Sequence, residues 1–278
     1  MAEAGMMKGK RGLVMGVAND HSIAWGIART LHAHGAEIAF SYQGDAQSRR
    51  LKPLADSIGS KILLPCDVED DSQMDAAFDV LRREWKTLDF VVHAIAFSDR
   101  DELKGRYVDT SRENFVRSLL ISCYSFTAVA RRAKAMMPNG GSLVTLTHMG
   151  AQRVIPNYNV MGVAKAALES SVRYLAADLG KDNIRVNAIS AGVMRTLAGS
   201  VIGESRVVFR WNKTQSPLNR TVDLDNVGNS ALYLLSDMGA GVTGEVHLVD
   251  AGYSIIGAPP STKLKGWTGD DEGAKEEN

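Results

Sequence analysis

The sequence predicts one α/β domain built on a doubly wound parallel sheet of about seven strands, with helices on both faces. Short apolar runs alternate with segments of helical periodicity along the 278 residues, without an internal repeat or a second domain. The first apolar run is also continuous, as in strands buried on both faces. Residues 1–257 are assigned to this domain, and the polar segment 258–278 is expected to be a flexible tail.

The predicted strands begin with GLVMGVA at 12–18, which contains β-branched residues and Gly16. This composition is typical of a buried parallel strand. Further strands are predicted at 37–42, 61–68, 89–97, 141–148, 184–190 and 244–254.

The first predicted helix begins at Ser22, a residue that can cap a helix, and ends at Gly35. Ile23, Ile27 and Leu31 recur in it at helical spacing. Further helices are predicted over about 45–58, 71–86, 111–136, 158–180 and 224–236. Residues 196–220 form a long connection without strand character, which favours a lid over an ordinary surface helix and loop.

The composition excludes several classes of function. Lys plus Arg equals Asp plus Glu at 32 each, and the aromatic residues are few, so we expect no nucleic-acid partner. No apolar run is long enough to span a bilayer, and the first residues lack the apolar core of a signal peptide, so no membrane association and a cytoplasmic location are expected. Cys66 and Cys123 form no CxxC pair and are predicted to be reduced thiols. No metal site is predicted.

The turn after the first strand is a candidate phosphate site of a Rossmann-like domain. Gly16, Ser22 and Gly26 stand between strand and helix, where backbone N–H groups can hold a pyrophosphate. The usual G-x-G-x-x-G pattern is absent, and a glycine turn is common in α/β folds. By itself the turn leaves phosphate binding open.

The second strand ends at Gln43, where this fold usually contacts the adenosine ribose. A neutral glutamine favours NADH over NADPH, although Arg49 and Arg50 on the next helix keep NADPH possible. Asp67 follows the third strand and either receives the adenine amino group or turns the chain before the next helix. The fourth strand ends in small residues near Ile95, which would let a cofactor approach the backbone.

Tyr158 and Lys165 are the strongest catalytic candidates. They are seven residues apart, close to two helical turns, so both side chains are expected on one helical face. The phenol can donate to a carbonyl oxygen, while the ammonium can hold a sugar hydroxyl and lower the phenol pKa from about 10. The alternatives are a packed core tyrosine and a solvated lysine.

With these motifs, the chain resembles the NADH-dependent enoyl-[acyl-carrier-protein] reductases of bacterial type II fatty-acid synthesis, a divergent branch of the short-chain dehydrogenase/reductase family. The resemblance covers about residues 8–257. Its most specific pieces are Gly16-x5-Ser22-Ile23-Ala24-Trp25-Gly26, Cys66-Asp67-Val68, Ile155 to Gly162 continuing to Lys165, and Arg185 to Gly192.

The spacing of tyrosine and lysine distinguishes this branch. Ordinary short-chain dehydrogenases have the tyrosine four residues before the lysine, where this chain has Met161, which cannot donate a proton. The resemblance implies that NADH gives hydride to C3 of a trans-2-enoyl thioester and that Tyr158 stabilises the enolate oxygen. C2 is then protonated, and Lys165 holds the nicotinamide ribose.

The resemblance also implies further site residues. The cofactor-binding set is Gly16, Ser22 and Ile23 at the pyrophosphate, Gln43 at the ribose, Asp67 and Val68 at the adenine, Ile95 along the cofactor, Lys165, and Met194, Arg195, Thr196, Leu197 and Ala198 at the nicotinamide end, with the Thr196 hydroxyl near the phosphate. The substrate-binding set is Ser98, Tyr158 and Met161.

Two positions depart from the family pattern. His148 stands where a second tyrosine is common, and Ala96 where a glycine is frequent. A histidine can titrate near neutral pH and take part in proton delivery, but we favour packing or orientation of the substrate for His148. Ala96 could narrow the pocket.

Two other functions stay open. The chain could be a carbonyl or 3-oxoacyl reductase of the wider short-chain dehydrogenase family, or a non-catalytic NAD-binding regulatory relative. The resemblance implies an acyl-carrier protein bearing an enoyl chain as partner and a homotetramer as assembly.

Overall fold

The computed structural model describes residues 5–194 and 205–258. Its centre is a parallel sheet of seven strands in the order β3-β2-β1-β4-β5-β6-β7. The strands are β1 Arg11–Met15, β2 Glu37–Tyr42, β3 Leu63–Pro65, β4 Phe90–His93, β5 Gly141–Thr147, β6 Ile184–Ala191 and β7 Val246–Val249. The predicted doubly wound α/β fold is therefore confirmed. The strand order reverses between β1 and β4, the position where such sheets bind ligands.

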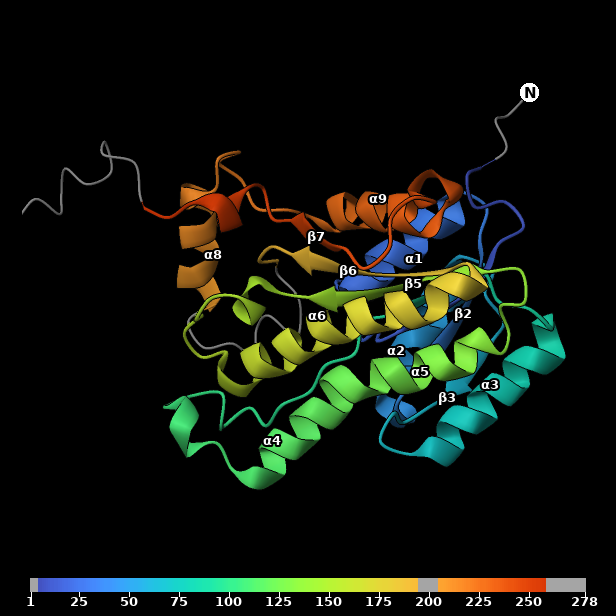
Figure 1. The fold of residues 1–278 in the computed structure, drawn as a ribbon, viewed down its shortest axis with the longest axis horizontal. Coiled ribbons are helices and arrows are strands. Elements are labelled where there is room, and N and C mark those ends of the chain that lie inside the picture. Colours follow the sequence, from blue (N-terminus) through green and yellow to red (C-terminus); the bar gives the residue numbers. More distant parts are fainter. Residues whose placement is uncertain (1–4, 195–204, 259–278) are drawn as a thin grey trace, which may run out of the picture.

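The helices cover both faces of the sheet (Figure 1). They are α1 Ile23–Ala33, α2 Gly44–Ser57, α3 Asp71–Trp85, α4 Arg112–Leu119, α5 Ser125–Lys134, α6 Asn159–Leu179, α8 Ser205–Gln215 and α9 Leu224–Leu235. One buried core joins the sheet to α3, α5 and α6, through Phe78, Phe126 and Leu168. A second core joins the other face to α1 and α9, through Ile27 and Val227.

Four predicted strands run several residues past the end that the structure shows, because each leaves the sheet where its pairing ends. Predicted strands 12–18, 61–68, 89–97 and 244–254 correspond to the shorter β1, β3, β4 and β7. After His93, for example, the Phe97 N–H donates to the Ser122 hydroxyl at 3.0 Å rather than to a strand.

The long helix predicted at 111–136 is interrupted. A π-helical turn at Leu120–Tyr124 separates α4 from α5. The hydroxyl of Ser125, the first residue after this turn, donates to the Ile121 carbonyl at 2.5 Å. Turns of this kind are frequent at functional sites, and this one supplies Ser122 to the loop that follows β4.

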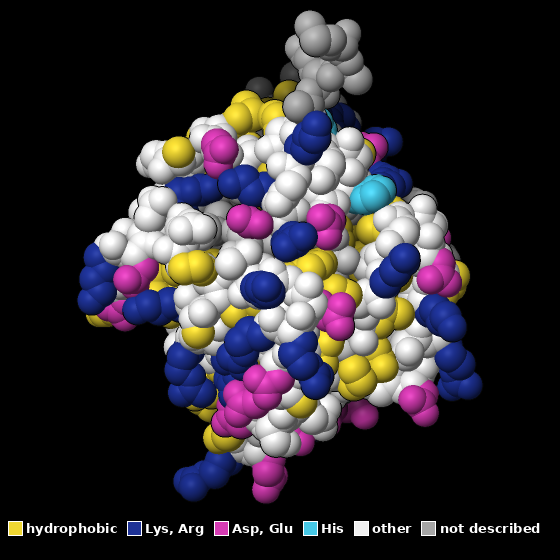
Figure 2. Space-filling model, turned by 90° about the vertical axis from the view of Figure 1, so that its right-hand side faces the viewer, with side chains coloured by type: hydrophobic (Ala, Val, Ile, Leu, Met, Phe, Trp, Pro, Cys, Tyr) yellow, Lys and Arg dark blue, Asp and Glu magenta, His cyan; other side chains and the backbone are white. Residues whose placement is uncertain are grey.

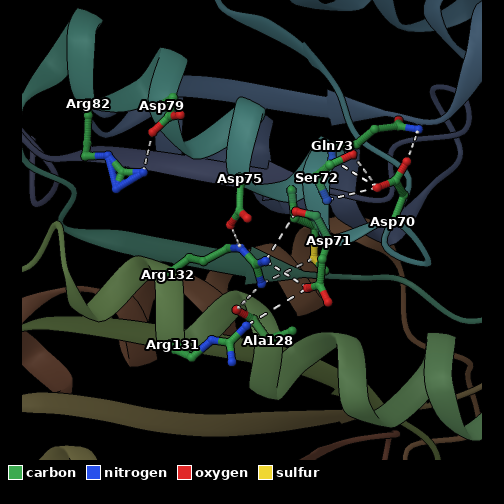
Figure 3. A network of polar contacts seen from close by, with 11 residues as sticks. Asp70, Asp71, Ser72, Gln73, Asp75, Asp79, Arg82, Ala128, Arg131 and Arg132 are labelled. Carbon is green, nitrogen blue, oxygen red and sulfur yellow. Dashed lines mark hydrogen bonds and ion pairs between the residues drawn. The ribbon is translucent and has the colours of Figure 1, made fainter.

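Arg132 on α5 ties this helix to α3 (Figure 3). Its guanidinium side chain is 8% exposed, with Nε 2.7 Å from an Asp75 carboxylate oxygen and Nη2 2.8 Å from an Asp71 carboxylate oxygen. Its Nη1 donates to the Ala128 carbonyl at 3.2 Å. Every part of this buried cation therefore has a partner, which is the condition for burying a charge without a large penalty.

Charges of both signs mix on the surface at the amino-terminal ends of the strands. Lys and Arg side chains lie among Asp and Glu side chains over this face (Figure 2), in keeping with the balanced composition.

Cys66 and Cys123 are free thiols, and burial raises the pKa of Cys66 to about 11. Across residues 5–194 and 205–258, none of the helices is both long and apolar enough to cross a bilayer.

Candidate active site

The carboxyl ends of the strands point to one side of the molecule, where α8 and the segment before α4 also lie (Figure 1). Gly16 begins the connection from β1 to α1 with a φ of +95°. A Cβ atom added there would lie 2.1 Å from the Ala94 carbonyl oxygen. The ends of β1 and β4 therefore lie closer together than any side chain at position 16 would allow, at the switch point where sheets of this kind bind ligands.

Ser22 occupies the position before α1, as predicted, but its hydroxyl does not cap the helix. Instead it accepts hydrogen bonds from the N–H groups of Ala18 and Asn19, both at 3.0 Å. The predicted side-chain capping role is therefore wrong, because the hydroxyl closes the β1–α1 loop on itself. The amino end of α1 keeps the free backbone donors that suit an anion.

The ends of β2 and β3 are connected by two of the three residues predicted to bind adenosine. Gln43 Nε2 donates to an Asp67 carboxylate oxygen at 2.8 Å. The other Asp67 oxygen accepts from the Glu69 N–H at 3.0 Å, so the structure shows the turn role considered for Asp67, while its adenine role stays a prediction. Gln47, which the sequence did not suggest, links the Gln43 N–H to the Val17 carbonyl at 2.7 and 2.8 Å.

The structure describes some of the other predicted cofactor-binding residues but not all of them. Ile23 opens α1, Val68 is buried beside β3, and Ile95 is half-buried against the core. Met194 is buried in the second core. Arg195, Thr196, Leu197 and Ala198 lie outside the described residues, as does the first part of the predicted lid; the rest of that segment contains α8.

Tyr158 immediately precedes α6 and is 8% exposed. The helix was predicted to include this residue, but it begins at Asn159, because Asn157 and Asn159 have left-handed φ values of 60° and 37°. The phenol lies in an apolar cluster with Leu103 and Met161.

The phenol pKa is raised above its ordinary value, first by burial and then by the Glu169 carboxylate. The expectation that Lys165 lowers it is therefore wrong. Burial disfavours the charged phenolate, and the Lys165 ammonium is held by the Leu146 carbonyl at 2.7 Å.

Lys165 is 5% exposed on α6. Burial lowers the pKa of its ammonium to about 8, while the charge of Glu169 opposes this shift. Glu169 follows one turn later and is also buried. Its two oxygens accept from the Thr147 hydroxyl at 2.8 Å and from Gln152 Nε2 at 3.4 Å. Glu169 was not predicted, although its spacing of four residues from Lys165 could have indicated it.

His148 lies against Tyr158, with ring centroids 4.9 Å apart. Its Nδ1 accepts from the Gly150 N–H at 3.1 Å, which requires an unprotonated nitrogen. Burial and then the charge of Lys165 lower the pKa of His148 to about 4. The ring is therefore neutral near pH 7, which supports packing or orientation rather than proton delivery.

The remaining predicted substrate residues meet around the π-helical turn. The Ser122 hydroxyl lies 3.1 Å from the Phe97 carbonyl and 3.9 Å from Met161 Sδ. Ser98 follows Phe97, and its hydroxyl donates to the Asn114 side-chain oxygen at 3.2 Å. The site thus combines a protonated phenol, a buried ammonium and an apolar wall beside the carboxyl ends of the strands.

The sequence model of the family described as Enoyl-(Acyl carrier protein) reductase matches residues 16–254. The chain belongs to this reductase family. The predicted family and enzyme class are therefore confirmed.

Relatives of the family cover almost the whole chain. The protein named Enoyl-[acyl-carrier-protein] reductase [NADH] 2 of Rhizobium meliloti is 60% identical, over 94% of this chain and 97% of its own length. The crystal structure of FabI from Candidatus Liberibacter asiaticus is 58% identical, with a TM-score of 0.91 over 92% of this chain and 99% of that one. The reductase of Anaplasma phagocytophilum, solved in complex with NAD, is 55% identical, with a TM-score of 0.88 over 94% and 97%.

Proposed function

We propose that this chain reduces the trans-2 double bond of enoyl-[acyl-carrier-protein] thioesters with NADH, in fatty-acid elongation. The observation that carries this proposal is the position of Tyr158. Its phenol is buried in an apolar cluster beside Met161, which occupies the place of the proton donor in ordinary short-chain dehydrogenases. The relatives named above support the substrate and the cofactor.

The residues present fit a dinucleotide. Gly16 lets β1 and β4 approach at the switch point, the β1–α1 loop precedes a helix amino end, and Gln43 with Asp67 ends the neighbouring strands. Gly16, Ser22 and Ile23 would hold the pyrophosphate, and Gln43, Asp67 and Val68 the adenosine. When bound, NADH supplies the hydride for C3 of the enoyl thioester.

Tyr158 acts on the thioester oxygen. Because its pKa is raised, the phenol is protonated at neutral pH and can donate to the oxygen as negative charge develops there. His148 packs on the phenol and limits its movement. The Leu146 carbonyl takes one of the three N–H donors of Lys165, and the others can bind the nicotinamide ribose.

We also propose an acyl-carrier protein as partner and a homotetramer as assembly. The outer faces of α5 and α6 support the homotetramer. Tyr174 is 73% exposed there, beside a hollow lined by small residues that another copy could fill, Thr127, Ala167, Ser170 and Ser171. The cytoplasmic location stays a prediction, as does the lid that residues 196–220 are expected to form.

The test is NADH oxidation by the purified protein with a trans-2-enoyl thioester, beside a 3-oxoacyl thioester and beside Tyr158→Phe. We expect turnover of the enoyl substrate, and a loss of roughly 100-fold in kcat for the variant, as for removal of one oxyanion donor. NADH binding, followed by its fluorescence, should persist. Preference for the 3-oxoacyl substrate would favour a carbonyl reductase. Binding without turnover of either substrate would favour a regulatory protein.

A further inference from the structure

Asn159 links the start of α6, next to Tyr158, to the connection between β4 and α4. It directly follows Tyr158 and begins α6 with a φ of 37°, a conformation that side chains other than glycine rarely adopt. Asparagine tolerates this region better than most residues, but the conformation still needs compensating contacts.

Those contacts come from the Asn159 side-chain amide. Its Nδ2 lies 3.3 Å from the Glu102 carbonyl oxygen, 3.1 Å from that of Leu103 and 3.3 Å from that of Gly105. One amide group therefore holds three backbone carbonyls of the short segment 102–105, in the connection between β4 and α4. An amide NH₂ is suited to this, because both of its hydrogens can be donated.

The held segment forms a wall beside the phenol. The Leu103 side chain is 5% exposed and packs in one cluster with Tyr158 and Met161. A displacement of residues 102–105 would therefore change the space next to the Tyr158 ring directly.

The same segment is fixed at its other side to α4. The Glu102 carboxylate accepts from the Ser111 N–H at 2.9 Å, from the Ser111 hydroxyl at 2.7 Å and from Asn114 Nδ2 at 3.2 Å. Asn114 is 5% exposed, and its side-chain oxygen also accepts from the Asp99 N–H at 2.9 Å. Asn114 and Asn159 thus hold residues 98–105 from opposite sides.

We propose that Asn159 is a positioning residue for the reduction, whose side-chain amide holds residues 102–105 against Tyr158 and so sets where the enoyl group stops relative to the phenol. This inference rests on the role proposed above for Tyr158. The held residues 102–105 are not among the predicted cofactor contacts, and Ile95, the predicted contact on the same connection, precedes the held segment. We therefore expect Asn159 to act on turnover rather than on NADH affinity.

Three substitutions separate the amide from the backbone conformation. Asn159→Gly keeps the left-handed conformation without strain but removes the amide. Asn159→Asp keeps the shape but faces the three carbonyls with carboxylate oxygens that cannot donate. Asn157→Gly is the control, since it loosens the other left-handed position beside Tyr158, with φ 60°.

The experiment measures kcat and KM for a trans-2-enoyl thioester, NADH affinity by fluorescence, and hydrogen–deuterium exchange over 98–106 without cofactor. We expect Asn159→Gly and Asn159→Asp to lose about 10- to 100-fold in kcat, as a small misplacement of reacting groups does. Their NADH affinity should stay within about twofold, and exchange over 98–106 should be faster. Asn157→Gly should retain most of the kcat.

Wild-type kcat in Asn159→Gly or Asn159→Asp would overturn the proposal, as would unchanged exchange over 98–106. A matching loss of NADH affinity in both would also overturn it, because the residue would then serve the cofactor. Failure of the proposed function is seen separately, as wild-type protein that does not turn over the enoyl thioester or as Tyr158→Phe with undiminished kcat.

Discussion

The His148 imidazole packs on the Tyr158 phenol with ring centroids 4.9 Å apart and ring planes inclined by 49°. Because the pKa of His148 is lowered to about 4, the contact involves a neutral ring at the pH values where the enzyme would be assayed. The residue that departs from the family pattern thus offers the phenol a flat surface rather than a proton.

His148→Phe tests this role. A phenyl ring preserves the packing but cannot titrate, so kcat should stay within roughly threefold of the wild-type value, with an unchanged profile between pH 5.5 and 7.5. His148→Ala is the matched control and should lower kcat further, because the Tyr158 ring loses its neighbour. A large loss in His148→Phe together with a new acidic limb would instead assign acid–base work to the imidazole.

The pKa of Lys165 predicts the pH at which kcat/KM falls on the basic side of its pH profile. Its ammonium has a pKa of about 8 in the free protein because it is buried. Above that pH the amine is neutral and loses its positive potential, so kcat/KM should fall with an apparent pKa near 8. The measurement is kcat/KM for the enoyl thioester from pH 6.5 to 9.5.

Glu169→Gln should move this limb. The Glu169 charge raises the pKa of Lys165, so its removal should lower that pKa and shift the limb toward neutral pH. The glutamine oxygen can still accept from the Thr147 hydroxyl, whereas the longer contact from Gln152 Nε2 to the other Glu169 oxygen is lost. Glu169→Asp keeps the charge and serves as control. A limb at the same pH in Glu169→Gln would show that another group titrates.

Much of this architecture follows from local patterns. The seven strands and most helices were predictable because apolar runs and helical spacing are local signals. Ser122 and Asn114 were not, since their contacts with Phe97 and Ser98 join residues far apart in the chain.

The direction of the pKa shift at Tyr158 and the ends of the helices could not be predicted from the sequence either. The direction of the Tyr158 pKa shift depends on burial and on the Glu169 carboxylate, and the spacing between Tyr158 and Lys165 indicates neither. The start of α6 depends on the left-handed Asn159, which apolar periodicity does not register. The long helix at 111–136 was predicted in position, but its π-helical turn has no periodic signature.

Gly16→Ala should damage both stability and cofactor binding. The position combines a left-handed φ of +95° with a Cβ site 2.1 Å from the Ala94 carbonyl oxygen. Gly59→Ala is the matched control, because Gly59 has a φ of +68° and open space around its Cβ site. The control should lose about 1–2 kcal/mol of unfolding free energy from backbone strain alone.

Gly16→Ala should lose more than the control and bind NADH weakly, because β1 and β4 must separate to admit the methyl group. Urea unfolding and NADH fluorescence measure the two effects. Equal losses of stability in both variants, with normal NADH binding in Gly16→Ala, would contradict the close approach of the strand ends.

Arg132 and Arg131 are neighbours on α5 with different surroundings, which allows a direct comparison of a buried and an exposed cation. The Arg132 side chain is 8% exposed and contacts Asp71 and Asp75, whereas Arg131 is 66% exposed and lies 4.0 Å from Asp71. Arg132→Met should lower the free energy of unfolding by about 1.5–3 kcal/mol, the range for hydrogen bonds to charged groups.

Arg131→Met should change the unfolding free energy by less than about 0.5 kcal/mol, as exposed ion pairs usually do. Methionine keeps most of the aliphatic stem in both variants, so the difference reports the guanidinium and its partners. Urea unfolding at low and at high salt measures it. The Arg132 loss should persist at high salt because its side chain is buried, whereas equal losses in the two variants would mean that the α3–α5 contact rests on apolar packing alone.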